Sequence, residues 1–204
     1  MEFLKRFFFD KLFGFFVKGF YNVRSGFIMS KYRRFVPFGD MVSDRWDKAS
    51  KLGFGEGTSI YDSSLILGDV KVGKNTWIGP QTVLDGYSAP LTIGDYCSIS
   101  SGVQIYTHNT VKWSITGGAH KNESAPVAIG SCVYIGPGTI ISKGVTIGEH
   151  VIIGACSYVD KPIPDFSVAW GQPARIIGKI EMNDDGTDYS IKYICLKGEV
   201  NSAS

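Results

Sequence analysis

Three histidines are the residues of this chain best suited to proton transfer near neutral pH, namely His108, His120 and His150. An imidazole changes its protonation state in this pH range, so it can take a proton from an attacking hydroxyl or amine. No two of the three are close neighbours in the sequence. The sequence therefore offers three separate candidate bases, and the elements that carry them must distinguish between them.

The four cysteines offer little further chemistry. Cys97, Cys132, Cys156 and Cys195 form no Cys-x-x-Cys pair, and the first three fall in a repetitive stretch where a small apolar thiol packs well. We therefore expect a reducing compartment and no disulfide framework. No set of metal ligands is visible, so no metal site is predicted.

A period of six residues organises the stretch from Ile129 to Pro164. An aliphatic residue opens each unit, Gly, Ser or Asp takes the second position, and a small or β-branched residue takes the fifth. This period is neither helical nor simple strand alternation, and it is typical of a parallel β-helix built from hexapeptide repeats. Three hexapeptides make one coil of about 18 residues, and stacked coils bury the opening side chains against one another.

The same phase runs upstream of this stretch. Openers recur every six residues from Phe54 to Leu84, and the next opener, Ile93, comes nine residues later. This spacing implies an insertion of three residues within residues 86–92.

A longer interruption separates Ile105 from the next opener, Ile129. An 18-residue excursion therefore leaves the β-helix between about residues 106 and 127. His108 lies at its start, and loops on a rigid scaffold are where chemistry tends to sit. His120 lies deeper in the excursion, and His150 occupies a solvent-facing corner at position four of its hexapeptide. The 15 hexapeptides amount to about five coils.

Composition limits the other function classes. The chain has 204 residues and a net charge of +2, which is too balanced to indicate nucleic-acid binding. No apolar run is long enough to span a bilayer, and charges interrupt the apolar stretches near the N-terminus, so we expect no secretory signal.

The N-terminal segment differs from the repeats because it is aromatic and basic. At about 100° per residue, one face of a helix would collect Leu4, Phe8, Phe9, Leu12, Phe13, Phe16 and Phe20, with Arg6, Asp10, Lys11 and Lys18 mostly opposite. This amphipathic helix can be a cap packed on the β-helix or on a neighbouring subunit. It can also be an interfacial anchor over residues 1–20, with Lys5, Arg6, Lys11 and Lys18 near anionic headgroups.

The pattern divides the chain into three regions. Residues 1–53 hold the N-terminal helical segment and a linker over 37–53, residues 54–180 form the β-helix with its loop at 106–127, and residues 181–204 form a short tail. Residues 191–196 fit either a short strand or a short helix.

A family resemblance rests on three of these features. The repeats, the excursion after residues 104–108 (Gln-Ile-Tyr-Thr-His) and the ending at 168–175 (Val-Ala-Trp-Gly-Gln-Pro-Ala-Arg) resemble the hexapeptide-repeat acyltransferases. The likeness is to sugar acetyltransferases of the galactoside and maltose type and of bacterial surface polysaccharides, and it covers about residues 54–180. It implies an all-β fold, a left-handed parallel β-helix that forms a homotrimer. It also implies acetyl transfer from acetyl-CoA to a sugar hydroxyl or amine.

The resemblance also implies roles for single residues. His108 occupies the place of the family's catalytic base, although the galactoside and maltose enzymes have one or two more residues before it, whereas here it follows Thr107 directly. Asp85 matches an acidic stretch that lines the acceptor pocket, and its alternative role is a turn-forming Asp before Gly86. Glu123, in the excursion, is a second candidate contact to the acceptor. The acid that orients His108 stays open.

For acetyl-CoA, the resemblance implies a groove between neighbouring subunits. Backbone groups of the later coils would contact the pantetheine arm, and basic residues near the last coil would meet the diphosphate. The residues carried over are Tyr134, Gly136, Ala155, Lys161 and Arg175, with Trp170 either stacked on adenine or acting as a hydrophobic lid on the last coil.

Two rival classes use the same kind of fold. The γ-type carbonic anhydrases need three metal-binding histidines, two of them five residues apart, and no such spacing occurs here. A non-catalytic β-helix, either a scaffold or an ice-binder, is the second rival. An ice-binder would need a flat face of regular Thr rows, whereas Thr58, Thr76, Thr82 and Thr139 are scattered at an inward position.

The acceptor and the location are the least defined expectations. The acceptor can be a nucleotide-linked sugar, a lipid-linked sugar or a polysaccharide. We expect a cytoplasmic enzyme, with peripheral contact at the inner face of the cell membrane if the N-terminal helix is an anchor.

Overall fold

The computed structural model describes residues 2–194, with side chains from residue 10 onward. Internal contacts divide the chain into two compact units, with the boundary between Asp44 and Arg45. Within residues 2–194, no helix is both long and apolar enough to cross a bilayer.

The first unit consists of two helices. α1 (Glu2–Tyr32) confirms the expected N-terminal helix and is continuous over 31 residues. α2 (Phe38–Val42) folds back on it, and the Nε of Arg24 donates a hydrogen bond to the Met41 carbonyl at 2.9 Å. Three members of the expected apolar face, Leu4, Phe8 and Phe9, and two of the expected cations, Lys5 and Arg6, have side chains outside the described part of the chain.

The prediction of a linker over residues 37–53 is wrong, because this stretch contains α2 and a further helix, α3 (Arg45–Lys51). α3 belongs to the second unit, where Ala49 is 1% exposed. The Nζ of Lys48 donates to the carbonyls of Tyr61 at 3.1 Å and Asp62 at 2.9 Å. Tertiary contacts of this kind stabilise helices that are too short to show a hydrophobic period.

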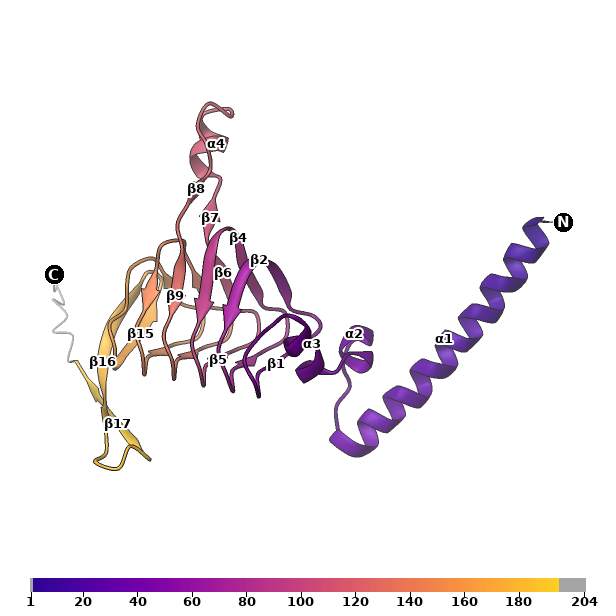
Figure 1. Cartoon of the computed structure of the whole chain (residues 1–204), viewed down its shortest axis with the longest axis horizontal. Helices are drawn as coiled ribbons and strands as arrows, with labels where there is room; N and C mark the ends of the chain where they lie inside the picture. The colour runs from indigo at the N-terminus through magenta and orange to yellow at the C-terminus, as the bar shows by residue number, and fades with distance from the viewer. Residues whose placement is uncertain (1, 195–204) are drawn as a thin grey trace, which may run out of the picture. The chain divides into compact units, whose positions relative to one another are not determined.

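The second unit winds as a parallel β-helix whose strands stack into three faces (Figure 1). Face 1 comprises β1 (Ser59–Ile60), β3 (Trp77–Ile78), β5 (Ser98–Ile99), β10 (Tyr134–Ile135), β13 (Ile152–Ile153) and β15 (Ser167–Gly171). Face 2 comprises the first residues of β2 (Leu65–Val72) and β4 (Val83–Ile93), then β6 (Gln104–Tyr106), β11 (Ile140–Ile141) and β14 (Tyr158–Val159). Face 3 comprises the last residues of β2 and β4, then β9 (Val127–Ile129) and β12 (Thr146–Ile147).

The strand register reproduces the repeat phase read from the sequence. Ile135 pairs with Ile153, which opens the unit one regular coil of three hexapeptides later. Leu84 pairs with Ile105 across a longer coil, because that coil holds the three-residue insertion. Ile105 pairs with Ile141 across the longest coil, because that coil holds the 18-residue excursion. The parallel β-helix and both interruptions are therefore confirmed.

The core is a column of the opening side chains. All the predicted openers are buried except Ile66, which is half-buried. The inward position five is polar at several coils, and some of its hydroxyls bond to the next coil. Thr58 Oγ1 donates to the Gly73 carbonyl at 2.7 Å, and Thr76 Oγ1 donates to the Gly94 carbonyl at 3.0 Å. These contacts explain why Thr is tolerated inside the β-helix.

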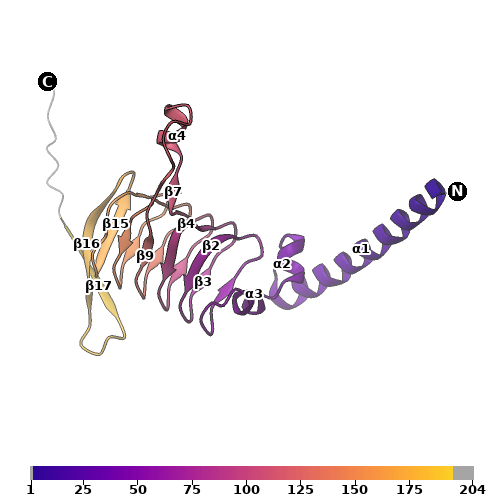
Figure 2. The same ribbon diagram turned by 45° about the horizontal axis from the view of Figure 1, so that its top comes forward.

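The C-terminal part of the described chain is an antiparallel hairpin at the last coil (Figure 2). β16 (Ala174–Met182) pairs with β15, and β17 (Tyr189–Tyr193) pairs with β16. The open choice for residues 191–196 is settled as strand up to Tyr193, and Cys195 and Leu196 lie outside the described residues. β16 also runs past residue 180, where the tail was expected to begin.

Candidate active site

Both interruptions of the repeat leave the β-helix at one corner, between face 2 and face 3. The three-residue insertion follows Leu84 and the 18-residue excursion follows Ile105, and these two openers are partners on adjacent strands. Asp85 and Tyr106 form the next pair of this register. The coil geometry therefore stacks the start of one interruption on the start of the other.

His108 and Asp85 come together at this corner. Nδ1 of His108 lies 2.8 Å from Oδ2 of Asp85, and the His108 side chain is 28% exposed whereas that of Asp85 is 1% exposed. The distance is that of a hydrogen bond, but the ring N–H direction is out of line with the oxygen, and Nδ1 has no other partner among the described residues. Contacts of this kind often align only when substrate is bound.

The other carboxylate oxygen holds Asp85 in place. Oδ1 accepts a hydrogen bond from the backbone N–H of Tyr87 at 2.9 Å, as in a turn initiated by Asp. The turn and the contact with His108 use different oxygens, so the two roles are compatible. Asp85, expected from the sequence as an acceptor contact, is brought by the fold to a ring nitrogen of His108.

This arrangement leaves Nε2 as the ring nitrogen of His108 that a substrate can reach, because Nδ1 is buried. A carboxylate next to Nδ1 favours the tautomer with its proton on Nδ1 and a free lone pair on Nε2. A partly exposed imidazole held in this way is suited to take a proton from a hydroxyl or amine.

Thr107 is a residue of this corner that sequence reasoning missed. Its side chain is fully buried, and its Oγ1 has no hydrogen-bond partner among residues 10–194. Its carbonyl accepts a hydrogen bond from the Ala125 N–H at 2.9 Å, which closes the base of the excursion. Buried hydroxyls without partners are rare in folded proteins. The only sequence signal was its place next to His108.

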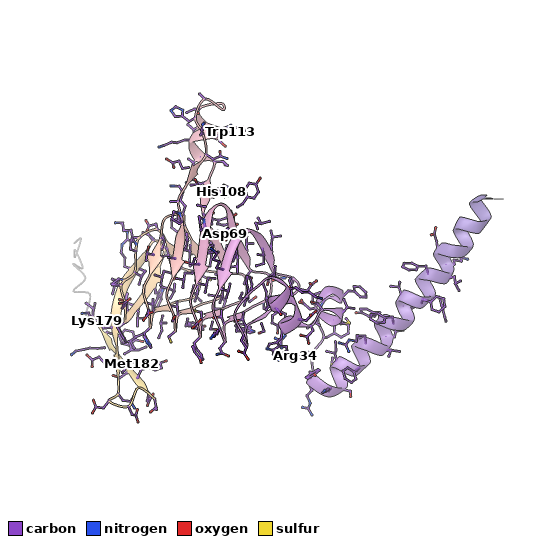
Figure 3. The ribbon with its side chains drawn as sticks, in the orientation of Figure 1. Arg34, Asp69, His108, Trp113, Lys179 and Met182 are labelled. Atoms are coloured by element: carbon purple, nitrogen blue, oxygen red, sulfur yellow. The ribbon has the colours of Figure 1, made fainter. Side chains whose placement is uncertain are left out.

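The excursion is a two-stranded arm that carries a short helix. β7 (His108–Asn109) pairs antiparallel with β8 (Glu123–Ser124), and α4 (Val111–Ile115) lies between them in sequence. The arm projects away from the coils (Figure 1), and Figure 3 shows His108 at its base and Trp113 near its tip. His108 is therefore positioned by the rigid β-helix more than by the tip of the arm.

Glu123 makes ion pairs that tie the arm to the next coil. Its carboxylate contacts Lys112 Nζ through Oε1, and Lys143 Nζ lies 3.5 Å from Oε2. The hydrogen bond from Lys112 holds the pKa of Glu123 below its ordinary value. Glu123, expected as an acceptor contact, is thus engaged by two lysines.

The two other histidines have different surroundings. His120 lies on the exposed stretch between α4 and β8, and its backbone N–H donates to Thr116 Oγ1 at 3.2 Å. The ring of His150 stacks on Phe166 with the centroids 4.8 Å apart and the planes 5° apart. His150 lies at the expected corner, but it is half-buried and packed on Phe166 instead of facing solvent freely.

Three of the residues expected to bind acetyl-CoA lie in one column, at the corner between face 1 and face 2. A Cβ on Gly136 would lie 2.5 Å from the backbone nitrogen of Ala155, and one on Gly154 would lie 3.1 Å from the Cβ of Trp170. The glycines therefore permit close stacking of the coils along this corner. Trp170 is 62% exposed, so its indole is accessible.

The remaining expected contacts are more dispersed. Tyr134 is on face 1, and Lys161 is exposed at the corner between face 2 and face 3. Arg175 is the strand partner of Trp170, and its Nη1 lies 3.6 Å from Oδ1 of Asp160. Within one chain, these residues do not converge on His108.

An apolar hollow of about 540 Å³ lies elsewhere, between face 1 and the C-terminal hairpin. Its lining is Cys132, Tyr134, His150, Val151, Ile152, Ile180, Met182, Tyr189 and Ile191. It includes neither His108 nor Asp85, so the candidate site is defined by the histidine–carboxylate contact and not by this hollow. Among the described residues, no group of three His, Cys, Asp or Glu side chains can hold a metal ion.

Comparisons with known proteins find the same hexapeptide repeat. Residues 126–161 match the family described as bacterial transferase hexapeptide (six repeats). The chain is 34% identical over 141 residues to galactoside O-acetyltransferase of Escherichia coli (strain K12), which covers 59% of this chain and 68% of that enzyme. It is 32% identical over 124 residues to the putative colanic acid biosynthesis acetyltransferase WcaF of the same strain, which covers 52% of this chain and 68% of that protein.

A solved structure gives the same result at the level of the fold. AntD, an N-acyltransferase from Bacillus cereus in complex with dTDP and 3-hydroxybutyryl-CoA, matches with a TM-score of 0.56 and 27% sequence identity. The match covers 61% of this chain and 70% of AntD.

Proposed function

Since this chain belongs to the hexapeptide-repeat acyltransferases and is an acetyl-CoA-dependent acetyltransferase, we propose that it acetylates a hydroxyl or amine of a sugar. Family membership also implies the left hand of the β-helix. The observation that carries the proposal is the contact between the partly exposed His108 and the buried Asp85, at the corner where both interruptions of the repeat begin.

In the proposed reaction, Nε2 of His108 takes the proton from the acceptor hydroxyl or amine as its oxygen or nitrogen attacks the thioester carbonyl. The bond from the acceptor atom to the carbonyl carbon forms, and the carbonyl π electrons move to its oxygen. When the carbonyl re-forms, the carbon–sulfur bond breaks and the thiolate of CoA takes the proton from His108. The thioester is already activated, so the reaction needs neither a covalent enzyme intermediate nor a metal.

Asp85 has a positioning role in this scheme. Its carboxylate keeps the His108 proton on Nδ1 and stabilises the imidazolium that forms during attack. Because Asp85 is buried, its charge acts on the ring with little screening by solvent. The oxyanion needs a hydrogen-bond donor, most simply a backbone N–H near the base of the arm.

The names of the relatives support a sugar acceptor. One relative is a galactoside O-acetyltransferase, another is a putative enzyme of colanic acid biosynthesis, and AntD was solved with dTDP. We propose by analogy that this chain acts in bacterial cell-surface polysaccharide biosynthesis, on a nucleotide-linked sugar, a lipid-linked sugar or a polysaccharide.

We propose that acetyl-CoA binds along the corner between face 1 and face 2. Gly136, Ala155 and Trp170 would line the pantetheine and adenine ends, and Tyr134, Lys161 and Arg175 would complete the contacts. Because these residues do not converge on His108 within one chain, the proposal includes a homotrimer in which the groove of one subunit meets the His108 corner of its neighbour. The enzyme would work in the cytoplasm.

The experiment is a thiol-release assay with acetyl-CoA and a panel of acceptors. The panel contains free galactosides, sugar nucleotides with and without an amino group, and undecaprenyl-linked sugars. Acceptor-dependent release of CoA from one class, lost in His108→Ala, supports the proposal. Acceptor-independent hydrolysis of acetyl-CoA as the only activity, equal in wild type and His108→Ala, contradicts it.

A further inference from the structure

We propose that α1 binds an anionic lipid surface through one exposed apolar stripe. The stripe consists of Leu12, Phe16, Phe20, Val23 and Phe27. The inference rests on the first unit alone and does not depend on the acceptor that the second unit acetylates.

The stripe is continuous and faces solvent. With 3.6 residues per turn, its five members fall within an arc of about 80°. Their exposed fractions range from 44% for Leu12 to 75% for Val23. Scattered exposed apolar residues are ordinary, but an exposed row of large side chains on one helix is typical of an interaction surface.

The opposite side of α1 is mostly polar or small. The helical period places Lys11, Lys18, Asn22 and Ser25 across from the stripe, and all but the half-buried Ser25 are exposed to solvent. Phe15 and Met29 interrupt this side. An apolar row backed by cationic and polar side chains is the pattern of a helix that lies in the plane of a membrane interface.

The packing of the first unit uses a different side of α1. Tyr21 meets Phe35 edge to face at 6.4 Å, and Ile28 is only 8% exposed. The segment that carries α2 therefore covers the side of Tyr21 and Ile28. It reaches the stripe at its edge, where the rings of Phe20 and Phe38 are 6.2 Å apart.

The charges identify the partner as anionic. The first unit, residues 1–44, contains eight Lys and Arg against four Asp and Glu, a net charge of +4. The other residues, 45–204, contain the remaining 13 Lys and Arg and 15 Asp and Glu, a net charge of −2, which gives the total of +2. A cationic aromatic segment on an otherwise acidic protein is complementary to a surface of anionic headgroups.

A second copy of α1 is the rival occupant. Phe16, Phe20, Val23 and Phe27 also follow a heptad spacing. However, the part of α1 with described side chains contains one acidic residue, Asp10, so parallel copies would bring like charges together without the acidic partners that coiled coils use. The charge pattern therefore favours lipid.

The test is flotation of the full chain with vesicles, without any substrate. We expect binding to phosphatidylcholine mixed with phosphatidylglycerol, weak binding to phosphatidylcholine alone, and release by salt. Phe16→Ser should lower the partition coefficient about tenfold, because one buried aromatic side chain is lost. Phe15→Ser is the matched control, since Phe15 is a neighbouring exposed aromatic outside the stripe, and it should have a much smaller effect.

The outcomes separate the alternatives. Flotation that depends on anionic lipid and on Phe16, with an unchanged oligomer mass and unchanged acetyl transfer to a soluble acceptor, supports the lipid surface. No flotation of the wild-type chain overturns it. A fall in oligomer mass in Phe16→Ser, with lipid binding intact, also overturns it and assigns the stripe to a second copy.

Discussion

Asp85 Oδ2 and His108 Nδ1 lie 2.8 Å apart although the two residues belong to successive coils. The contact follows from the way successive coils stack, because Leu84 and Ile105 are strand partners and both interruptions of the repeat begin just after them. A carboxylate that is almost fully buried is thereby held against the imidazole that we propose as the base.

The role of Asp85 can be separated from its place in the turn. Asp85→Asn keeps an oxygen for the Tyr87 N–H but presents an amide to His108, which favours the wrong tautomer of the ring. We expect kcat to fall roughly 10²- to 10⁴-fold with little change in the unfolding midpoint. Steady-state kinetics beside thermal unfolding measures both. Loss of folding without a specific fall in kcat would assign Asp85 to the turn alone.

Glu123 allows a test of how the arm is held. If its ion pairs position the arm, Glu123→Gln and Lys143→Met should lower kcat to a similar extent. Lys121→Met, which removes a lysine of the arm that does not pair with Glu123, should not. If Glu123 instead contacts the acceptor, Glu123→Gln alone should raise the acceptor KM. Acceptor titrations of the three variants decide between the two roles.

Acid should loosen the arm in a way that depends on Glu123. Its folded-state pKa is lowered, chiefly by Lys112, so its stabilising contribution is present above the ordinary carboxyl pKa of 4.5 and is lost as the pH falls through the lowered value. Hydrogen exchange of the arm across this range should show the loss in wild type and not in Glu123→Gln. Equal profiles for the two proteins would contradict the assignment.

The close stacking at Gly136 makes a stability prediction. An added methyl would lie 2.5 Å from the backbone nitrogen of Ala155, so the coils must shift. We expect Gly136→Ala to lower the free energy of unfolding by about 1–3 kcal/mol. The control is Gly26→Ala in α1, where no atom lies within 4 Å of the added methyl and no loss is expected. Chemical denaturation of both variants gives the comparison. An unchanged free energy of unfolding in Gly136→Ala would show that the coils are stacked less tightly than the 2.5 Å approach implies.

The β-helix could be predicted from the sequence because its signal is periodic. Each opener, such as Ile135 or Ile153, marks both its inward direction and its strand partner. Because the repeat is regular, the phase slip before Ile93 and the gap before Ile129 also predicted the two interruptions. Short elements without a period were missed, as with α3, whose helix depends on the contacts of Lys48 and Ala49 with the first coil.

The site was predicted less completely than the fold. The resemblance indicated His108, and the repeat phase placed it at the start of the excursion. The contact with Asp85 required the three-dimensional fact that both interruptions share one corner. Two further features could not be predicted: the buried Thr107 hydroxyl without a hydrogen-bond partner, and the pairing of Glu123 with lysines. Both depend on the directions of side chains at the arm, which no spacing in the sequence encodes.

Assembly is a separate prediction. If the acetyl-CoA groove needs two subunits, light scattering should give a mass three times that of the 22.3 kDa chain, with three equivalent sites. A monomer that is stable and fully active would remove the shared groove and require a site built within one chain.

The turnover of His108→Ala tests the central claim most directly. Without the base, kcat should fall roughly 10²- to 10⁴-fold, and the pH profile should lose the limb that belongs to the imidazole. The dissociation constant for acetyl-CoA should stay close to that of wild type, because the base acts on the acceptor during the reaction. His120→Ala, in the exposed part of the arm, should have a much smaller effect. Near-normal turnover of His108→Ala together with an inactive His120→Ala would contradict the assignment and place the base farther along the arm.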